Sequence, residues 1–269
     1  MKLAFTTLGC PDWTLDRIIE RAAAYGFDAI DFRGLRGTLD IYRLPEFAAR
    51  AEETCARIRE AGLAVSCFSS SVRLLDADDP AKNREEVRAY ARLCERFGTP
   101  FIRVFGGRIG GMKREEAIET LARRLDELAR EAEAHGARLL LETHDDWLDS
   151  AHVRAVLERV ESASVGVLWD VHHPWRLLGE EPETTWSNIG RWVQYTHVKD
   201  SRGTVEQYAY CLTGEGEVPL ARICAVLRNN GYDGYYTFEW EKRWHPEIAE
   251  PEAAFPQYAQ YMRALDEGA

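Results

Sequence analysis

The sequence lacks the long apolar segments that membrane insertion or secretion requires. No apolar run approaches the ~20 residues of a membrane span. The opening residues MKLAFTTLGCPDW contain no apolar stretch of the kind that a secretion signal carries. Six cysteines are scattered without a CxxC pair, which argues against a zinc ribbon or a thiol redox motif. We therefore expect a cytoplasmic protein with free thiols and no membrane partner.

The chain is also short of positive charge. Its 34 Lys and Arg residues face 45 Asp and Glu residues, which gives a net charge of -11. Such a surface repels a phosphate backbone, whereas proteins that bind duplexes usually carry a basic stripe. The composition therefore disfavours nucleic acid as a partner. With 45% hydrophobic and 29% charged residues, the chain has an ordinary globular balance.

Short β-prone runs alternate with amphipathic helical segments along the whole chain. We expect strands at 2–7, 29–33, 64–69, 101–105, 138–142, 165–170, 193–198 and 234–240. Helices are expected at 16–25, 44–61, 82–97, 114–135 and 220–230. Glycines that should close helices in the left-handed conformation follow five of these segments, at Gly26, Gly62, Gly98, Gly136 and Gly231.

This alternation predicts an α/β fold, a single-domain (β/α)8 TIM barrel spanning residues 1–269, since such barrels typically use about 250 residues. An open doubly wound sheet is the alternative. It is disfavoured because TLGCPDW, after the first strand, does not fit a Gly-rich phosphate loop. Residues 204–218 are expected to form a long loop on the active side of the barrel.

Four consecutive strands end on residues that can bind a metal ion. The segments ARLLLETHDD and VGVLWDVHH place Glu142 and Asp170 at strand ends, and VQYTHVKD and YYTFEWEK place His197 and Glu239 there. Because barrel active sites form at the carboxyl ends of the strands, these side chains should converge. Three carboxylates and one imidazole suit one divalent ion, Mn²⁺ or Mg²⁺, and also accept Zn²⁺, Co²⁺ or Fe²⁺.

Further polar residues near these strand ends could contact a substrate. His144 and Lys199 lie two positions after Glu142 and His197, on the same strand faces. His173 follows Asp170 by three residues. Arg33 and Arg73, after the second and third strands, could bind hydroxyl or anionic groups, although arginines there often only pair with acids. Tryptophans near strand ends, including Trp240 and Trp244, could offer flat apolar walls to a sugar.

The stretches ETH, WDVHH, THVKD and FEWEKRWHP resemble the last four strand ends of the xylose isomerase-like TIM barrel superfamily. This group includes the sugar phosphate isomerases and epimerases and the AP endonuclease 2-type barrels, and the resemblance covers nearly the whole chain. It implies that Glu142, Asp170, His197 and Glu239 bind the metal ion. It also implies that the two glutamates are catalytic and move protons on opposite faces of the substrate. In epimerase-like members, a histidine at the position of His173 contacts substrate hydroxyls.

The resemblance implies a metal-dependent isomerase or epimerase that acts through an enediolate on a ketose, a sugar acid or a polyol-derived ketone. The alternative is a lyase or dehydratase acting on a keto-inositol or 3-keto-glycoside. A non-catalytic sugar-binding barrel and an endonuclease are weaker readings. The endonuclease branch needs extra histidines, which DFRG, CFSSS, RVFGG and LTGEGEV do not supply. The resemblance also implies a small-molecule carbohydrate substrate and a homo-oligomer.

Overall fold

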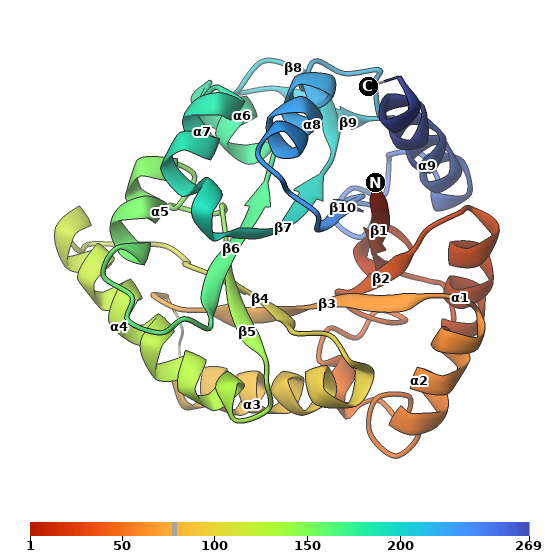
Figure 1. Ribbon diagram of the computed structural model, residues 1–269, viewed down its shortest axis with the longest axis horizontal. Helices are drawn as coiled ribbons and strands as arrows, with labels where there is room; N and C mark the ends of the chain where they lie inside the picture. Colours follow the sequence, from red (N-terminus) through yellow and green to blue (C-terminus); the bar gives the residue numbers. More distant parts are fainter. Residues whose placement is uncertain (77–79, 269) are drawn as a thin grey trace. The chain divides into compact units, whose positions relative to one another are not determined.

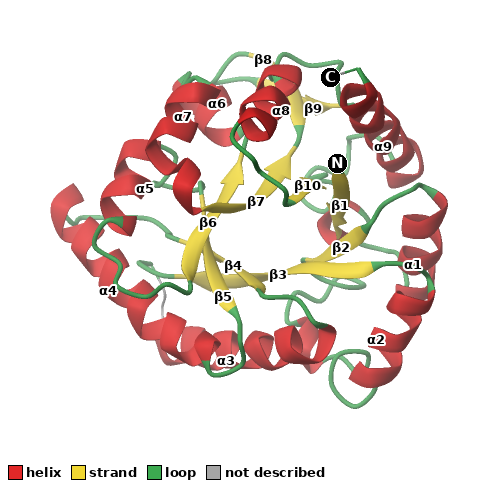
Figure 2. Cartoon of the chain, in the orientation of Figure 1, coloured by secondary structure: helices red, strands yellow, loops and turns green. Residues whose placement is uncertain are grey.

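A computed structural model describes residues 1–76 and 80–268; residues 77–79 and 269 of the expected 1–269 domain lie outside it. Within the described residues, eight parallel strands form a closed barrel in the order β1-β10-β7-β6-β5-β4-β3-β2. Helices alternate with these strands along the chain (Figure 1, Figure 2). The expected (β/α)8 TIM barrel is confirmed. No helix in the described part of the chain is long and apolar enough to cross a membrane.

The chain divides into two compact units, residues 1–66 with 196–269, and residues 67–195. Two barrel strands run across the division, β3 (Ala64–Arg73) and β7 (Val193–Val198). The first unit also holds β1 (Lys2–Thr6), α1 (Leu15–Ala24), β2 (Ala29–Phe32), α2 (Ala51–Glu60), β8 (Asp200–Gly203), β9 (Tyr208–Cys211), α8 (Leu220–Asn229), β10 (Tyr235–Phe238) and α9 (Pro251–Glu267). Its short 3₁₀ turns are η1 (Thr7–Gly9) and η2 (Ile41–Arg43).

Aromatic packing joins α9 to the strands of this first unit. Tyr258 stacks on Phe238 of β10 with ring centroids 4.4 Å apart, and Phe255 contacts Phe5 of β1 at 4.6 Å. These side chains are fully buried. Each such pair contributes about 0.5–1.5 kcal/mol beyond the burial of its apolar surface. The carboxyl-terminal helix thereby covers strands β1 and β10, beside which it is drawn in Figure 1.

In the described residues of the second unit, β3 is followed by strands β4, β5 and β6, each of which lies between two helices along the chain. Its elements are α3 (Pro80–Phe97), β4 (Phe101–Phe105), α4 (Arg114–Glu133), β5 (Arg138–Glu142), α5 (Ser150–Leu157), β6 (Val165–Asp170), α6 (His173–Leu178), α7 (Pro182–Ile189) and the 3₁₀ turn η3 (Gly190–Trp192). Strand β5 lies between β4 and β6 and pairs with both in parallel register. Phe105, the last residue of β4, is paired with Glu142, the last residue of β5, so these two strands end at the same level.

Several expected segments differ from the structure. The third strand continues to Arg73 and does not end at residue 69, so Arg73 lies in the strand and not after it, and the eighth strand ends at Phe238 and not at residue 240. The helix expected at 44–61 begins only at Ala51, because residues 45–50 form turns and Arg50 has a non-helical backbone with φ -112° and ψ 22°. The segment 204–218 is not wholly a loop. It contributes β9, which pairs with β8 in an antiparallel hairpin, because YAYC is rich in β-prone aromatics. The five helix-closing glycines all have positive φ, as expected.

Candidate functional site

The predicted site residues fall into both units. Glu142, His144, Asp170 and His173 belong to the unit of residues 67–195. Arg33, His197, Lys199 and Glu239 belong to the other.

Glu142 ends β5 as a fully buried carboxylate beside a buried cation. Nη1 of Arg103, from the neighbouring strand β4, lies 3.1 Å from Glu142 Oε2, and both side chains are only 1% exposed. The guanidinium carbon of Arg103 also lies 3.8 Å from the ring centroid of Phe105, in cation–π geometry. Burying a charged carboxylate away from water costs free energy. The opposite charge of Arg103 offsets this cost for Glu142.

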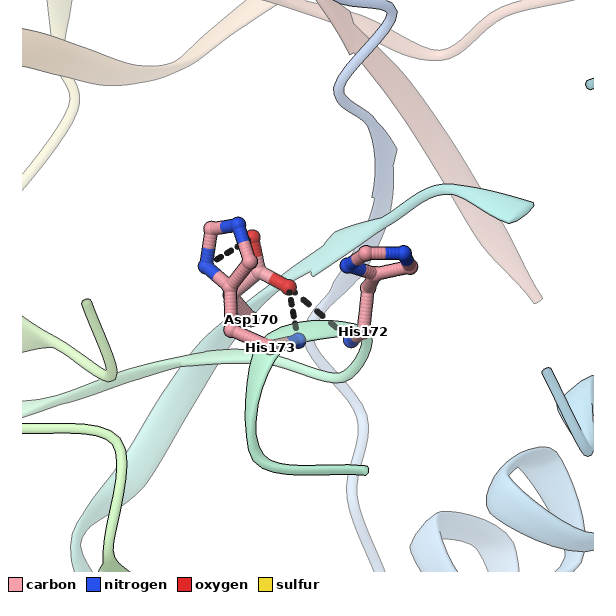
Figure 3. Close-up of side chains that lie close together, drawn as sticks. All are labelled: Asp170, His172 and His173. Carbon is pink, nitrogen blue, oxygen red and sulfur yellow. Dashed lines mark hydrogen bonds and ion pairs between the residues drawn. The ribbon is translucent and has the colours of Figure 1, made fainter. Parts of the chain in front are cut away.

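Asp170 ends β6 and fixes the turn into α6 (Figure 3). Its Oδ1 accepts hydrogen bonds from the backbone N–H groups of His172 and His173, at 2.9 and 3.1 Å. Its Oδ2 lies 3.2 Å from Nδ1 of His173. All three residues are buried, and their ligand atoms lie within 4.8 Å of one another, so they form an acidic and histidine cluster that could hold a metal ion.

His144 stands beside this cluster. Its ring centroid lies 4.9 Å from that of His173 and 4.7 Å from that of Phe105. Its Nδ1 is 3.1 Å from Oδ1 of Asp145. Burial raises the pKa of Asp145. The hydrogen bond with His144 and the charges of His144 and Arg73 together lower this pKa by more, so it lies below the usual value. The side chain of His144 is 31% exposed and therefore accessible to a ligand.

Arg73 pairs with acidic residues, as arginines at such positions often do. Its Nη1 lies 2.9 Å from Oδ2 of Asp145 and 3.9 Å from Oδ2 of Asp76. This arginine is therefore engaged with acids of its own unit.

In the other unit, the buried imidazole of His197 lies between two carboxylates. Its Nδ1 is 3.1 Å from Glu239 Oε1, and its Nε2 is 3.2 Å from Oδ2 of Asp31. His197 is on β7, Asp31 is on β2, and Glu239 directly follows β10. The carboxylate of Asp31 can hold the ring in one orientation, as carboxylates behind metal-binding histidines commonly do.

Glu239 also has a buried cation. Nζ of Lys199 is in hydrogen-bonding contact with Glu239 Oε2 and lies 3.1 Å from Oε1 of Glu241. Lys199 is fully buried, so its stem and ammonium are held among protein atoms. Each of the two strand-end glutamates thus forms an ion pair with a buried cation, Glu142 with Arg103 and Glu239 with Lys199.

Arg33 follows β2 and is 8% exposed. Its backbone N–H donates to Oγ1 of Thr7 at 2.9 Å, and that hydroxyl donates to the carbonyl of Gly34 at 2.6 Å. These bonds fix the backbone at the end of β2, where the sequence places Arg33.

Sequence reasoning missed several charged or polar residues that contact the predicted ones, namely Asp31, Arg103, His172 and Glu241. A signal was present for Asp31 and Arg103. Each is a charged residue within an apolar strand, AIDF or FIRVF, and each is fully or almost fully buried. Such residues are rarely buried unless they are paired.

Comparison with known proteins supports the fold. A family model described as xylose isomerase-like TIM barrel matches residues 19–265. A crystal structure of the probable 3-DHS dehydratase AsbF from Bacillus anthracis is 18% identical, with a TM-score of 0.83, covering 98% of this chain and 99% of its own. No curated protein matches the sequence.

Two further solved structures are similar. The IOLI protein with a bound zinc atom has a TM-score of 0.81 and 18% identity, covering 98% of each chain. An L-ribulose 3-epimerase has a TM-score of 0.78 and 17% identity, covering 100% of this chain and 95% of its own. At these identities the similarity shows the fold.

Proposed function

The chain belongs to the xylose isomerase-like TIM barrel family, and from that premise we propose that it is a divalent-metal-dependent isomerase or epimerase. Its substrate in this proposal is a ketose, a sugar acid or a polyol-derived ketone. The observation that carries the proposal is the pairing of each candidate base with a buried cation, Arg103 with Glu142 and Lys199 with Glu239. Two buried, charge-compensated carboxylates suit a reaction that moves a proton between carbon atoms.

The proposed metal ligands are Glu142, Asp170, His197 and Glu239. In the unit of residues 67–195, Glu142 and Asp170 are fully buried carboxylates at the ends of neighbouring strands, and in the other unit Nδ1 of the buried His197 lies 3.1 Å from Glu239 Oε1, which supports this set. Three carboxylates and one imidazole suit Mn²⁺ or Mg²⁺ and can also accept Zn²⁺, the metal of the similar IOLI structure. When bound, the ion supplies polarisation of substrate carbonyl and hydroxyl oxygens, which acidifies the neighbouring C–H bond.

The chain's own residues then perform the proton transfer. One glutamate accepts the proton of the acidified C–H bond, which leaves an enediolate. In an epimerisation, the other glutamate enters the cycle protonated and donates that proton to the opposite face of the same carbon. In an isomerisation, the first glutamate returns the proton to the adjacent carbon, while a hydroxyl proton moves from one substrate oxygen to the other. His173 and His144 can donate hydrogen bonds to substrate hydroxyls, and Arg33 and Lys199 can contact substrate oxygens. Similar structures include a ketose epimerase, which supports a small carbohydrate as the substrate.

Solvent deuterium exchange tests this proposal. The protein is incubated in D₂O with a panel of ketoses, sugar acids and keto-inositols, and the products are analysed by NMR. We expect deuterium at one carbon without loss of water. Glu142→Gln and Glu239→Gln should each slow exchange by about 10²–10⁴-fold. Glu127→Gln is the matched control, because Glu127 pairs with Arg123 on an exposed helix face.

The outcomes separate the candidate reactions. An unsaturated product would indicate a lyase or dehydratase and overturn the isomerase proposal. Full exchange activity in either active-site variant would overturn the two-base mechanism.

A further inference from the structure

A cavity of about 510 Å³ lies in the unit of residues 1–66 and 196–269, next to the β8–β9 hairpin. The hairpin and the segment from Trp240 to Ala249 both contribute residues to its lining. Its size falls within the range of small-molecule sites. None of the proton-transfer residues lines it, so the proposed reaction does not account for it.

Aromatic rings form part of the cavity wall. The rings of Tyr208 and Tyr210 lie 5.6 Å apart, nearly perpendicular, and His245 contacts Tyr210 at 5.1 Å. Trp240 is 1% exposed, and its Nε1–H donates to the carbonyl of Ala249 at 2.9 Å, which joins two lining residues of the same segment. Flat rings held in place suit the C–H face of a sugar, and tyrosine hydroxyls can bond to its hydroxyl groups.

The charges around the cavity are of both signs. Arg202 supplies a cation, and Glu215 and Glu247 supply carboxylates. His245 Nδ1 lies 3.1 Å from Glu247 Oε1, so this histidine already has an acidic partner. A phosphate or carboxylate ligand would meet two acids for one arginine. A neutral polyhydroxyl ring, which donates and accepts hydrogen bonds, fits this mixture better.

The cavity is close to one candidate base. Nζ of Lys199 lies 6.0 Å from the ring centroid of Tyr210, and the same ammonium contacts the carboxylate of Glu239. Trp240, in the cavity wall, directly follows Glu239 in the chain. Tyr210 therefore lines the cavity and is also near the cation that contacts this glutamate.

We propose that this cavity is a subsite for a second, neutral sugar ring, so that the substrate class is a keto-glycoside or keto-disaccharide. One ring then occupies the cavity while the keto ring lies at Glu239. This inference rests on the proposed function for the identity of the reacting ring. The subsite itself rests on the cavity's rings and charges.

Isothermal titration calorimetry tests the subsite without turnover. The full-length, as-purified protein is titrated with maltose, cellobiose, trehalose, glucose and glucose 6-phosphate. We expect at least one neutral disaccharide to bind about tenfold more tightly than glucose, a gain of about 1.4 kcal/mol. Glucose 6-phosphate should bind no more tightly than glucose.

Variants localise the binding. Tyr208→Ala should remove the disaccharide preference, and Ala209→Trp should do the same by filling the cavity without deleting a contact group. Trp244→Ala is the matched control, because Trp244 belongs to the same segment, is 53% exposed and does not line the cavity. Thermal unfolding verifies that each variant is folded.

Equal binding of disaccharides and glucose to the wild-type protein would overturn the subsite, as would an undiminished preference in folded Tyr208→Ala and Ala209→Trp. Tighter binding of glucose 6-phosphate would overturn the neutral-ring assignment. These failures are distinct from failure of the proposed reaction. Deuterium exchange into monosaccharides alone would support the proposed reaction and exclude the second ring. A preference for disaccharides without any exchange would support the subsite and overturn the proposed reaction.

Discussion

Oδ2 of Asp31 lies 3.2 Å from Nε2 of His197 in the buried interior of one unit. The other ring nitrogen of His197, Nδ1, is 3.1 Å from Glu239. A proton on Nε2, shared with Asp31, leaves the Nδ1 lone pair directed toward the carboxylate that we propose as a fellow ligand. Asp31 is therefore a positioning residue for His197.

Asp31→Asn should weaken metal binding by about 10–100-fold, because the amide supports the required imidazole tautomer less well than the carboxylate. Competition with a fluorescent chelator measures the affinity. Asp28→Asn, in the same unit, is the control, because Asp28 bonds to Arg263 and the Leu3 backbone. Unchanged affinity in Asp31→Asn would contradict the positioning role.

Arg103→Met should destabilise the fold by ~3–5 kcal/mol, because it leaves Glu142 as a buried charge without this cation. Urea denaturation measures the free energy of unfolding. Arg88→Met is the comparison, because Arg88 makes two bonds to Glu131 but is 50% exposed, and its loss should change stability little. Similar effects of the two substitutions would show that burial of the Arg103–Glu142 pair is unimportant.

The lowered pKa of Asp145 predicts a pH dependence of stability. A carboxyl whose pKa is lower in the folded state stabilises the fold above its unfolded pKa of ~3.9, and that contribution is lost as the pH falls through the folded value. Between about pH 5 and about pH 3, the wild-type protein should therefore lose more unfolding free energy than Asp145→Asn. Asparagine tolerates the positive φ of 52° at this position. Urea titrations with parallel losses in the two proteins would argue against this role.

The sequence predicts the barrel because its strands and turns have strong local signals. Strands 101–105, 138–142, 165–170 and 193–198 have the expected bounds, since each is a short run rich in β-branched, aromatic or other apolar residues. The helix expected at 44–61 is shorter in the structure because residues 45–50 form turns, which the run of helix-forming residues does not reveal. The β8–β9 hairpin was missed because its strands are short and partly polar.

The sequence marks the strand-end residues and the buried charges Asp31 and Arg103, but it does not reveal which of these residues pair with one another. Asp31 and His197 are 166 positions apart, so only the three-dimensional pairing of β2 and β7 residues reveals their contact. Arg103 and Glu142 lie on neighbouring strands, and their ion pair depends on side-chain directions that the alternation of strands and helices does not specify. The cavity beside the hairpin depends on a loop conformation that composition does not encode.

The metal content of the purified protein tests the central claim most directly. Elemental mass spectrometry before and after chelation is compared for the wild-type protein, Asp170→Asn and His197→Ala. The account predicts about one divalent ion per wild-type chain, removed by chelation and strongly reduced in both variants. Undiminished metal content in folded variants, or about three zinc ions per chain as in a nuclease-type cluster, would contradict it.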